Sequence, residues 1–243
     1  MRKEPFAIND FVHVYNRGNR KQEIVRDEKD RKHFLQMLYY FNTEITPDNP
    51  IKSLRTLKLK SDFNFVWPEI WQPRKPIVEV YAFALMNNHY HLLLREIREG
   101  GITLFMRRLG TSMTNRFNLK YRDSGRLFQG AYKARRVATD EYLSYLSVYI
   151  QVKNPFELYF QKKKIKTAGI QKQSDFNEAF EWASHYPYCS LAHYTTEKKV
   201  NIIQEDLFKY FIDEDISKDY KKFAQKCLYG FDLTEQLGTL SID

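Results

Sequence analysis

The spacing of hydrophobic and polar residues changes several times along the N-terminal two thirds of the chain. Near-alternation and short apolar runs rich in Val, Tyr and Phe predict strands at residues 11–18, 77–86, 89–94 and 126–138. Apolar residues at helical spacing predict helices at residues 27–41 and 102–119, and a third that begins with Asp140 as its N-cap. Asn154-Pro155 should end this third helix or come just after it, because the residue before a proline disfavours helical geometry.

This order of elements predicts an α+β fold. Asn87-Asn88 is a hairpin turn between the second and third strands, so the sheet should be antiparallel and ferredoxin-like, with helices on one face. Residues 1–160 would form this domain, with the proline-rich stretch 43–73 as an inserted loop. Residues 161–243 would form a helical C-terminal extension, in which residues 176–182 and 207–228 are the better helix candidates.

Composition describes a soluble globular chain. The 243 residues are 43% hydrophobic and 28% charged, with nine glycines and eight prolines, which argues against disorder and fibrous repeats. No stretch approaches the roughly 18 apolar residues of a membrane span, so we expect a cytoplasmic protein without a membrane partner. The two cysteines, Cys189 and Cys227, lie far apart and predict ordinary buried thiols rather than a zinc site.

Positive charge is concentrated in the middle of the chain. The formal net charge is +9, and residues 95–136 carry eleven basic side chains against three acidic ones. Arginines interleaved with aromatic residues suit nucleic acid, because cations attract phosphates and rings stack on unpaired bases; the alternative is an ordinary solvated surface. As a group, six residues are the candidate DNA contacts: Arg107, Arg108, Arg116, Lys133, Arg135 and Arg136.

A pair of histidines lies within the third predicted strand. Successive strand side chains point to opposite faces, so His89 and His91 share one face while Tyr90 points into the core. Two imidazoles on one face can bind a single divalent ion. An isolated His-x-His pair is more often structural than metal-binding, so the neighbouring motifs matter.

Several segments together resemble the single-tyrosine HUH transposases, including their REP-associated relatives. The segments that carry this resemblance are Val14 to Asn19, Ala84 to Leu94, Arg126 to Gly130, Asp140 to Leu143, Tyr149 to Pro155 and Tyr186 to Leu191. The histidine hairpin from Ala84 to Leu94 is the most specific of them.

The resemblance implies cleavage and rejoining of single-stranded DNA, with hairpin DNA as the expected partner. Tyr149 stands in the place of the nucleophile, and the product would be a 5′-phosphotyrosine link with a free 3′-hydroxyl. His89, His91 and Asn154 stand in the places of the metal ligands, with Mg²⁺ or Mn²⁺ as the expected ion. The family often works as a dimer, so a homodimer is one expected assembly.

One spacing departs from the family pattern. The family usually has four residues from the tyrosine to the asparagine, whereas Tyr149 and Asn154 are five apart. On a regular helix this turns Asn154 about 100° away from the expected direction and puts Lys153 in its place. A local bulge could restore Asn154, Gln151 or water could be the third ligand, or Lys153 could replace part of the metal's electrostatic role.

Two other functions are compatible with the same residues. The altered spacing would suit a hairpin DNA- or RNA-binding protein that has lost cleavage. The histidine pair would also suit a phosphohydrolase in which the metal activates water. Tyr142 and Tyr145 are alternative nucleophiles on the same predicted helix.

Overall fold

The framework of the fold is one antiparallel sheet. The computed structural model describes residues 6–47, 50, 52–53, 65–164, 173–204, 206–211 and 214–230. In this part of the chain the strands are β1 (Phe11–Arg17), β2 (Val78–Leu85), β3 (His89–Glu96) and β4 (Lys133–Arg136), arranged in the order β2-β3-β1-β4. Helix α1 (Glu28–Tyr40) connects β1 to β2, and α3 (Gly101–Tyr121) connects β3 to β4. This is the ferredoxin-like arrangement, so the predicted α+β fold is confirmed.

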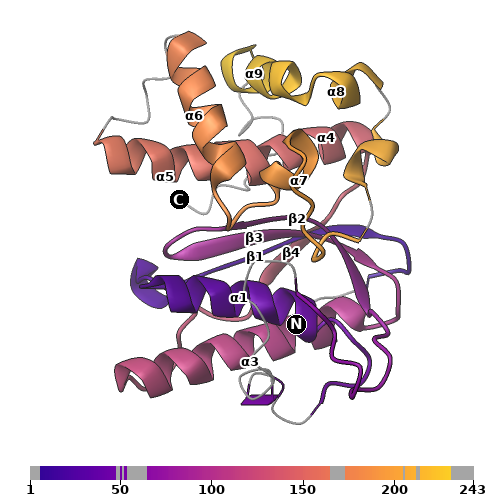
Figure 1. Ribbon diagram of the computed structural model, residues 1–243, viewed down its shortest axis with the longest axis vertical. Coiled ribbons are helices and arrows are strands. Elements are labelled where there is room, and N and C mark those ends of the chain that lie inside the picture. The colour runs from indigo at the N-terminus through magenta and orange to yellow at the C-terminus, as the bar shows by residue number, and fades with distance from the viewer. Residues whose placement is uncertain are drawn as a thin grey trace.

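Helices α1 and α3 cover one face of the sheet (Figure 1). Phe34 of α1 packs on Tyr90 of β3, with ring centroids 5.4 Å apart, and both residues are fully or almost fully buried. Helix α3 begins where Glu96 accepts a hydrogen bond from the Ile102 N–H at 2.8 Å. A Cβ at Gly101 would lie 2.1 Å from the backbone oxygen of Ile77, the residue before β2. Only glycine therefore lets α3 start this close to the sheet.

Three predicted boundaries were wrong. The last strand is limited to β4, because residues 126–132 form bends after Gly125, whose φ is +90°, and of these residues only Phe128 keeps an isolated bridge, to Gly18. The N-cap of α4 (Asp140–Val148) is Thr139, whose Oγ1 accepts from the Tyr142 N–H at 3.1 Å, while Asp140 lies in the first turn. Asn154-Pro155 does not end the helix.

The helix instead continues through a wide turn. After α4 comes the π-helical turn η2 (Tyr149–Lys153), and then α5 (Asn154–Lys163), in which Pro155 occupies the first turn. A proline is tolerated there because the N–H groups in the first turn of a helix have no acceptor within that helix, so the N–H that proline lacks costs α5 no hydrogen bond. The expected domain boundary after residue 160 falls inside α5.

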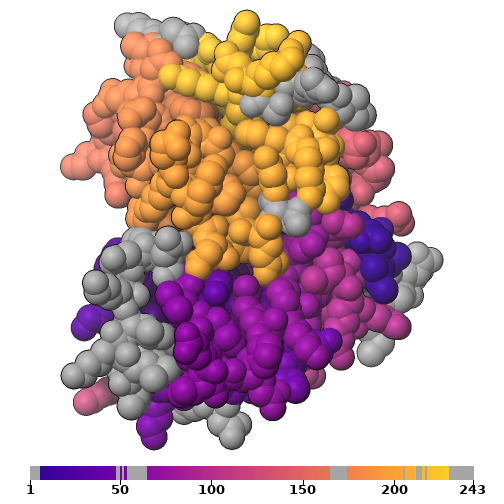
Figure 2. Space-filling view, turned by 45° about the vertical axis from the view of Figure 1, so that its right-hand side comes forward, coloured from indigo at the N-terminus to yellow at the C-terminus, as the bar shows by residue number. Residues whose placement is uncertain are grey.

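The second face of the sheet is covered by α4, η2 and α5, and beyond these lies the C-terminal part of the chain (Figure 1). Its helices are α6 (Gln173–His185), α7 (Leu191–Thr195), η4 (Leu207–Tyr210), α8 (Glu214–Lys218) and α9 (Tyr220–Gly230). The helix expected at residues 176–182 is therefore confirmed, whereas 207–228 divides into three shorter helices. Figure 2 shows this orange and yellow half in close contact with the indigo and magenta half.

Backbone hydrogen bonds join the C-terminal part to the edge strand β2. The Leu85 N–H donates to the Tyr188 carbonyl and the Ser190 N–H to the Phe83 carbonyl, both at 2.9 Å. The Tyr194 hydroxyl donates to the Tyr81 carbonyl at 2.6 Å. These bonds cover part of an edge that would otherwise expose unpaired backbone groups.

The expected inserted loop, 43–73, is only partly described, since residues 48–49, 51 and 54–64 lie outside the described residues. Its aperiodic aromatic stretch packs on α1, where Trp67 stacks on Tyr40 at 6.1 Å between centroids and Trp71 meets Trp67 at 5.0 Å. Cys189 and Cys227 are buried free thiols, as expected. No helix in the described part of the chain is long and apolar enough to cross a membrane.

Candidate active site

Strand register places both histidines of the hairpin on the sheet face opposite α1 and α3. Arg17 of β1 lies opposite His89, and Tyr15 lies opposite His91. Residues directly opposite in an antiparallel pair point to the same face. The alternating pattern therefore predicted the shared face of His89 and His91 correctly, and their ring centroids are 5.3 Å apart.

A third histidine, His13 of β1, lies against His91. The His13 Nε2 and the His91 Nδ1 are 2.8 Å apart in a hydrogen bond, and neither side chain is exposed to solvent. Burial, and then the positive charge of Arg135, lowers the pKa of His13 from 6.5 to about 3. Burial, and then the neighbouring charges of His13 and His89, holds the pKa of His91 well below its usual value. Both imidazoles are therefore neutral at pH 7, which is the form that binds metals.

The hydrogen bonds engage the same ring nitrogen, Nδ1, of both hairpin histidines. His89 Nδ1 lies 2.7 Å from the Asn88 Oδ1, an oxygen that can only accept, so Nδ1 carries the proton and Nε2 keeps its lone pair. His91 uses Nδ1 toward His13, and its buried Nε2 has no hydrogen-bond partner among the described residues. Binding of one ring nitrogen while the other is held by a neighbour is the usual arrangement of metal-ligating histidines.

Two imidazoles do not complete a metal site. Within the described residues no group of three His, Cys, Asp or Glu side chains could hold a metal ion together. A cation held by His89 and His91 would therefore take further oxygen donors from an amide, a phosphate or water. Mg²⁺ and Mn²⁺ accept such oxygen ligands.

Tyr149 is brought to the histidines by the start of η2. Its ring centroid lies 5.2 Å from that of His91 and 6.1 Å from that of His13, with near-perpendicular ring planes in both cases. Only 7% of Tyr149 is exposed, so the packing fixes the ring. The Lys153 Nζ lies 5.0 Å from the centre of this ring and 3.4 Å from the Glu157 carboxylate.

The two alternative tyrosines lie elsewhere on the same helix. Tyr142 packs beneath the Arg135 guanidinium, 5.2 Å from its ring centre, and Tyr145 stacks on Phe223 of α9 at 5.9 Å. Among these three tyrosines of the described structure, Tyr149 alone makes a ring contact with a histidine. The geometry therefore favours Tyr149 as the reactive phenol.

The wide turn η2 carries Asn154 back toward Tyr149. The Asn154 backbone N–H donates to the Tyr149 carbonyl, which is the five-residue bond of a π turn, and the Asn154 Nδ2 donates to the same carbonyl at 2.7 Å. Pro155 has no N–H for the Gln151 carbonyl, and the Cys189 thiol donates to that carbonyl instead at 3.4 Å. A local bulge is thus present where the five-residue spacing suggested one.

Gln151, the other candidate ligand, faces the C-terminal part of the chain. The Ser190 hydroxyl donates to its Oε1 at 3.0 Å, and its Nε2 donates to the Tyr220 hydroxyl at 3.4 Å. Its side chain is fully buried. Gln151 therefore connects the helix to α7 and α9 through both of its polar atoms.

The structure divides the six candidate DNA contacts between two faces of the sheet. Lys133 and Arg135 lie opposite Tyr15 and His13, on the histidine face. Arg136 points to the other face and its Nε pairs with the Asp10 carboxylate at 2.9 Å. The three arginines of α3 also lie on that other side, so the group predicted from charge is not one surface (Figure 1).

Two residues of this site were missed by sequence reasoning. His13 and Tyr15 occupy alternate positions of β1, and Tyr15 stacks on His91 with centroids 5.7 Å apart. The available signal was the alternation of β1, which puts both side chains on one face. Alternation alone does not say which strand lies beside β1, so their contact with His91 could not be foreseen.

Comparison with known proteins gives a match to one family model and similarity to solved structures. Residues 59–153 match the family model described as transposase IS200 like, a stretch that includes His89, His91 and Tyr149. No curated protein matches the chain. A solved structure of a REP-associated tyrosine transposase bound to a REP hairpin overlaps 84% of this chain and 90% of that one, at 14% identity and a TM-score of 0.43. Values this low transfer no residue roles.

The family match covers less than half of the chain, and it contains the hairpin and the tyrosine on which the resemblance rests. His13 and Asn154 lie outside the matched stretch. The resemblance to the single-tyrosine transposases is confirmed, since residues 59–153 of this chain match the IS200-like transposase family.

Proposed function

We propose that this protein cleaves and rejoins single-stranded DNA by a metal-dependent transposase reaction in which the Tyr149 oxygen is the nucleophile. The observation that carries the proposal is the contact of Tyr149 with His91, 5.2 Å between ring centroids, on a buried sheet face. The match to a transposase family supports DNA transposition as the general role.

The reaction exchanges one phosphodiester for another. The Tyr149 oxygen forms a bond to phosphorus, the bond from phosphorus to the 3′ oxygen breaks, and the phenol proton is balanced by the proton that the 3′ oxygen gains. The downstream fragment is then held through its 5′ phosphate as a phosphotyrosine ester, and the upstream fragment ends in a 3′-hydroxyl. Because the bond energy is conserved in this ester, rejoining needs no nucleotide hydrolysis.

The chain's own residues orient the groups that react. His89 and His91 would hold the cation through Nε2, and the Asn154 Oδ1 is the proposed third donor because Nδ2 is already used toward the Tyr149 carbonyl. A bound Mg²⁺ or Mn²⁺ would supply charge neutralisation at the scissile phosphate. Lys153, whose Nζ lies 5.0 Å from the Tyr149 ring centre, adds a further positive charge beside the proposed nucleophile.

The substrate is proposed to be DNA with a hairpin beside an unpaired segment. Lys133 and Arg135 extend the positive charge of the histidine face next to Tyr15 and His13, where a strand that reaches Tyr149 would pass. Phosphate contacts of this kind position a strand without reading its sequence.

The test is the formation of a covalent adduct. Purified protein is incubated with end-labelled hairpin oligonucleotides and Mn²⁺ or Mg²⁺, and a denaturation-resistant protein–DNA band is sought on a gel. Tyr149→Phe and His89→Ala should abolish the band. Tyr15→Phe is the matched control, because it removes the same atom from another tyrosine that stacks on His91, and it should retain the band.

Each other outcome assigns a different function. Hairpin binding without any adduct over a broad oligonucleotide panel would indicate a binding protein that has lost cleavage. Metal-dependent cleavage that survives in Tyr149→Phe would indicate hydrolysis by water. An adduct that is lost in Tyr15→Phe and kept in Tyr149→Phe would move the nucleophile to β1.

A further inference from the structure

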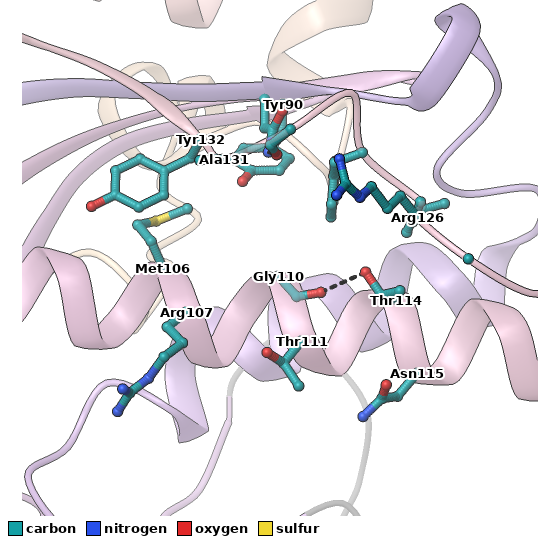
Figure 3. A pocket seen from close by; sticks show the side chains of 15 residues that line it. Tyr90, Met106, Arg107, Gly110, Thr111, Thr114, Asn115, Arg126, Ala131 and Tyr132 are labelled. Atoms are coloured by element: carbon teal, nitrogen blue, oxygen red, sulfur yellow. Dashed lines mark hydrogen bonds between the residues drawn. The ribbon is translucent and has the colours of Figure 1, made fainter. Parts of the chain in front are cut away.

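A cavity of about 640 Å³ lies on the sheet face away from the histidines. One wall is α3, and the other is the segment of residues 125–132 that leaves the sheet before β4 (Figure 3). Its floor is apolar, formed by the buried side chains of Tyr90, Leu127 and Phe128. The sheet therefore separates this cavity from Tyr149.

The two arginines at this cavity differ from the other basic residues of α3. Arg107 and Arg126 line it, and neither forms a hydrogen bond or ion pair with any described residue. By contrast, Arg108 donates to the carbonyls of Phe41, Thr43 and Glu44, so its guanidinium already binds backbone groups of the fold.

The remaining basic side chains of α3 form ion pairs with acidic residues at the start of α1. The Arg116 Nε lies 3.7 Å from the Asp30 carboxylate, and the Lys120 Nζ lies 2.6 Å from both Asp27 and Asp30. Uncompensated arginines beside a cavity are typical of a site for phosphate groups, because their charge and planar donors remain available. Arg107 and Arg126 are therefore the anion-binding pair of this region.

A glycine in the middle of α3 keeps the cavity open. A Cβ at Gly110 would meet no atom within 4 Å, so close packing does not require glycine at this position. Glycine also weakens a helix interior relative to alanine. Neither close packing nor helix stability therefore accounts for a glycine at position 110. Gly130, on the facing wall, has the same open surroundings.

The remaining lining suits a planar ring. Figure 3 shows the Tyr132 ring over Met106 at one end, and Thr111 and Asn115 on the helix. An aromatic ring and an apolar floor favour stacking of a nucleobase, and amide and hydroxyl groups can bond to its edge. A cavity of this size accommodates one nucleotide with its phosphate.

We propose that this cavity binds one unpaired nucleotide of the DNA strand, with the base over the apolar floor and the flanking phosphates at Arg107 and Arg126. The proposal rests on the proposed function, because it requires single-stranded DNA as the substrate. The cavity selects the strand on one face of the sheet, while Tyr149 cleaves on the other.

The first experiment fills the cavity. In Tyr149→Phe protein, which cannot form the adduct, affinity for a fluorescently labelled hairpin oligonucleotide with unpaired flanks is measured by anisotropy. Gly110→Leu should weaken binding about tenfold, the lower end of the loss expected for one stacked base. Gly110→Ala is the matched control and should bind within about twofold of the parent, because a single methyl group leaves most of the space.

An abasic scan identifies the nucleotide. Each unpaired base of the oligonucleotide is removed in turn, and one position should lose about tenfold in affinity with the parent. The same removal should cost little in Gly110→Leu, since the base is already excluded. Loss at no position, or equal loss in both proteins, would overturn the proposal.

Salt dependence tests the arginines. Arg107→Gln and Arg126→Gln should each reduce the slope of log affinity against log salt by about 0.7, the value for one phosphate contact on a single strand. Arg116→Gln, on the same helix but paired with Asp30, should leave the slope unchanged. Slopes unaffected by Arg107→Gln and Arg126→Gln would overturn the assignment of the phosphates.

The two proposals can fail separately. If the protein that retains Tyr149 forms the adduct, and Tyr149→Phe binds DNA but its folded Gly110→Leu variant binds equally well, only the cavity assignment is wrong. If the parent binds no DNA of the panel, both proposals are wrong. Circular dichroism of each variant establishes folding, and Gly110→Leu should be at least as stable as the parent because leucine favours a helix interior.

Discussion

At the scale of single residues, the environment of His91 depends on His13. An exposed histidine titrates near neutral pH and exchanges its ring proton between two nitrogens. His91 does neither, since burial keeps it neutral and the 2.8 Å bond to His13 engages Nδ1. The His91 Nε2, which has no hydrogen-bond partner among the described residues, therefore remains available for a cation. His13 is a positioning residue in this arrangement, because it acts through His91.

Removing His13 should weaken metal binding. In His13→Ala the His91 Nδ1 loses its partner and the ring loses its fixed orientation, so Mn²⁺ affinity should fall about 10- to 100-fold, as for other partners of ligating histidines. His13→Gln, which can still bond to Nδ1, should recover part of the loss. Electron paramagnetic resonance titration with Mn²⁺ measures this without DNA cleavage, and unchanged affinity in His13→Ala would show that His91 needs no such support.

At the scale of elements, the position of Tyr149, the proposed nucleophile, depends on a helix that widens for one turn. Tyr149 lies at the start of η2 and Asn154 directly after it, and the extra residue of the π turn gives both backbone and side chain of Asn154 a bond to the Tyr149 carbonyl. In a regular α-helix the bond would come from Lys153 instead. The five-residue spacing is therefore accommodated by the backbone, and Lys153 stays beside the Tyr149 ring.

Substitution of Asn154 separates its two proposed roles. Asn154→Ala loses the buried hydrogen bond from the side-chain amide to the Tyr149 carbonyl and should lower the free energy of unfolding by about 1–2 kcal/mol. The same substitution should also lower the affinity for Mn²⁺. Asn154→Asp loses the same donor but keeps an oxygen ligand, so it should destabilise the fold while retaining metal affinity. Urea unfolding and Mn²⁺ titration measure the two effects. Equal metal affinity in all three proteins would remove Asn154 from the ligand set.

At the scale of the whole molecule, the sheet separates two functional surfaces. The histidine face is covered by α4, η2 and the C-terminal helices, and the other face by α1 and α3 (Figure 1). The layer of α1 and α3 is tied together by Asp30, which accepts from Lys120 at 2.6 Å and from the Tyr121 hydroxyl at 2.5 Å. Burial alone would raise the pKa of Asp30, but these bonds outweigh it and hold the pKa below its usual value.

This carboxylate should make stability depend on acid pH. Because the folded state lowers the pKa of Asp30, its contribution is present above the pKa of the unfolded chain and is lost as the pH falls through the folded value. Asp30→Asn should lower the free energy of unfolding by about 2–3 kcal/mol at pH 7, since bonds to a buried charge are lost.

The difference between Asp30→Asn and the parent should begin to shrink below about pH 4, where Asp30 of the unfolded chain takes up a proton, and should be lost once the pH falls below the lowered pKa of the folded state. Urea unfolding at several pH values measures it. Asp27→Asn is the control, because Asp27 is largely exposed and its loss should cost less. If the difference in free energy of unfolding stays constant down to about pH 3, the charge of Asp30 is not what stabilises the contact between α1 and α3.

The sequence by itself determined the elements and the faces on which their side chains lie. Periodicity fixed the ferredoxin-like order, and alternation put His89 and His91 together, because both depend only on the local geometry of the backbone. Tertiary structure decided which neighbours meet. Strand pairing brought His13 to His91, packing placed Tyr149 rather than Tyr142 or Tyr145 against the histidines, and hydrogen bonds and ion pairs engaged Arg108 and Arg116 but not Arg107. These outcomes depend on contacts between residues far apart in the chain, which no local pattern encodes.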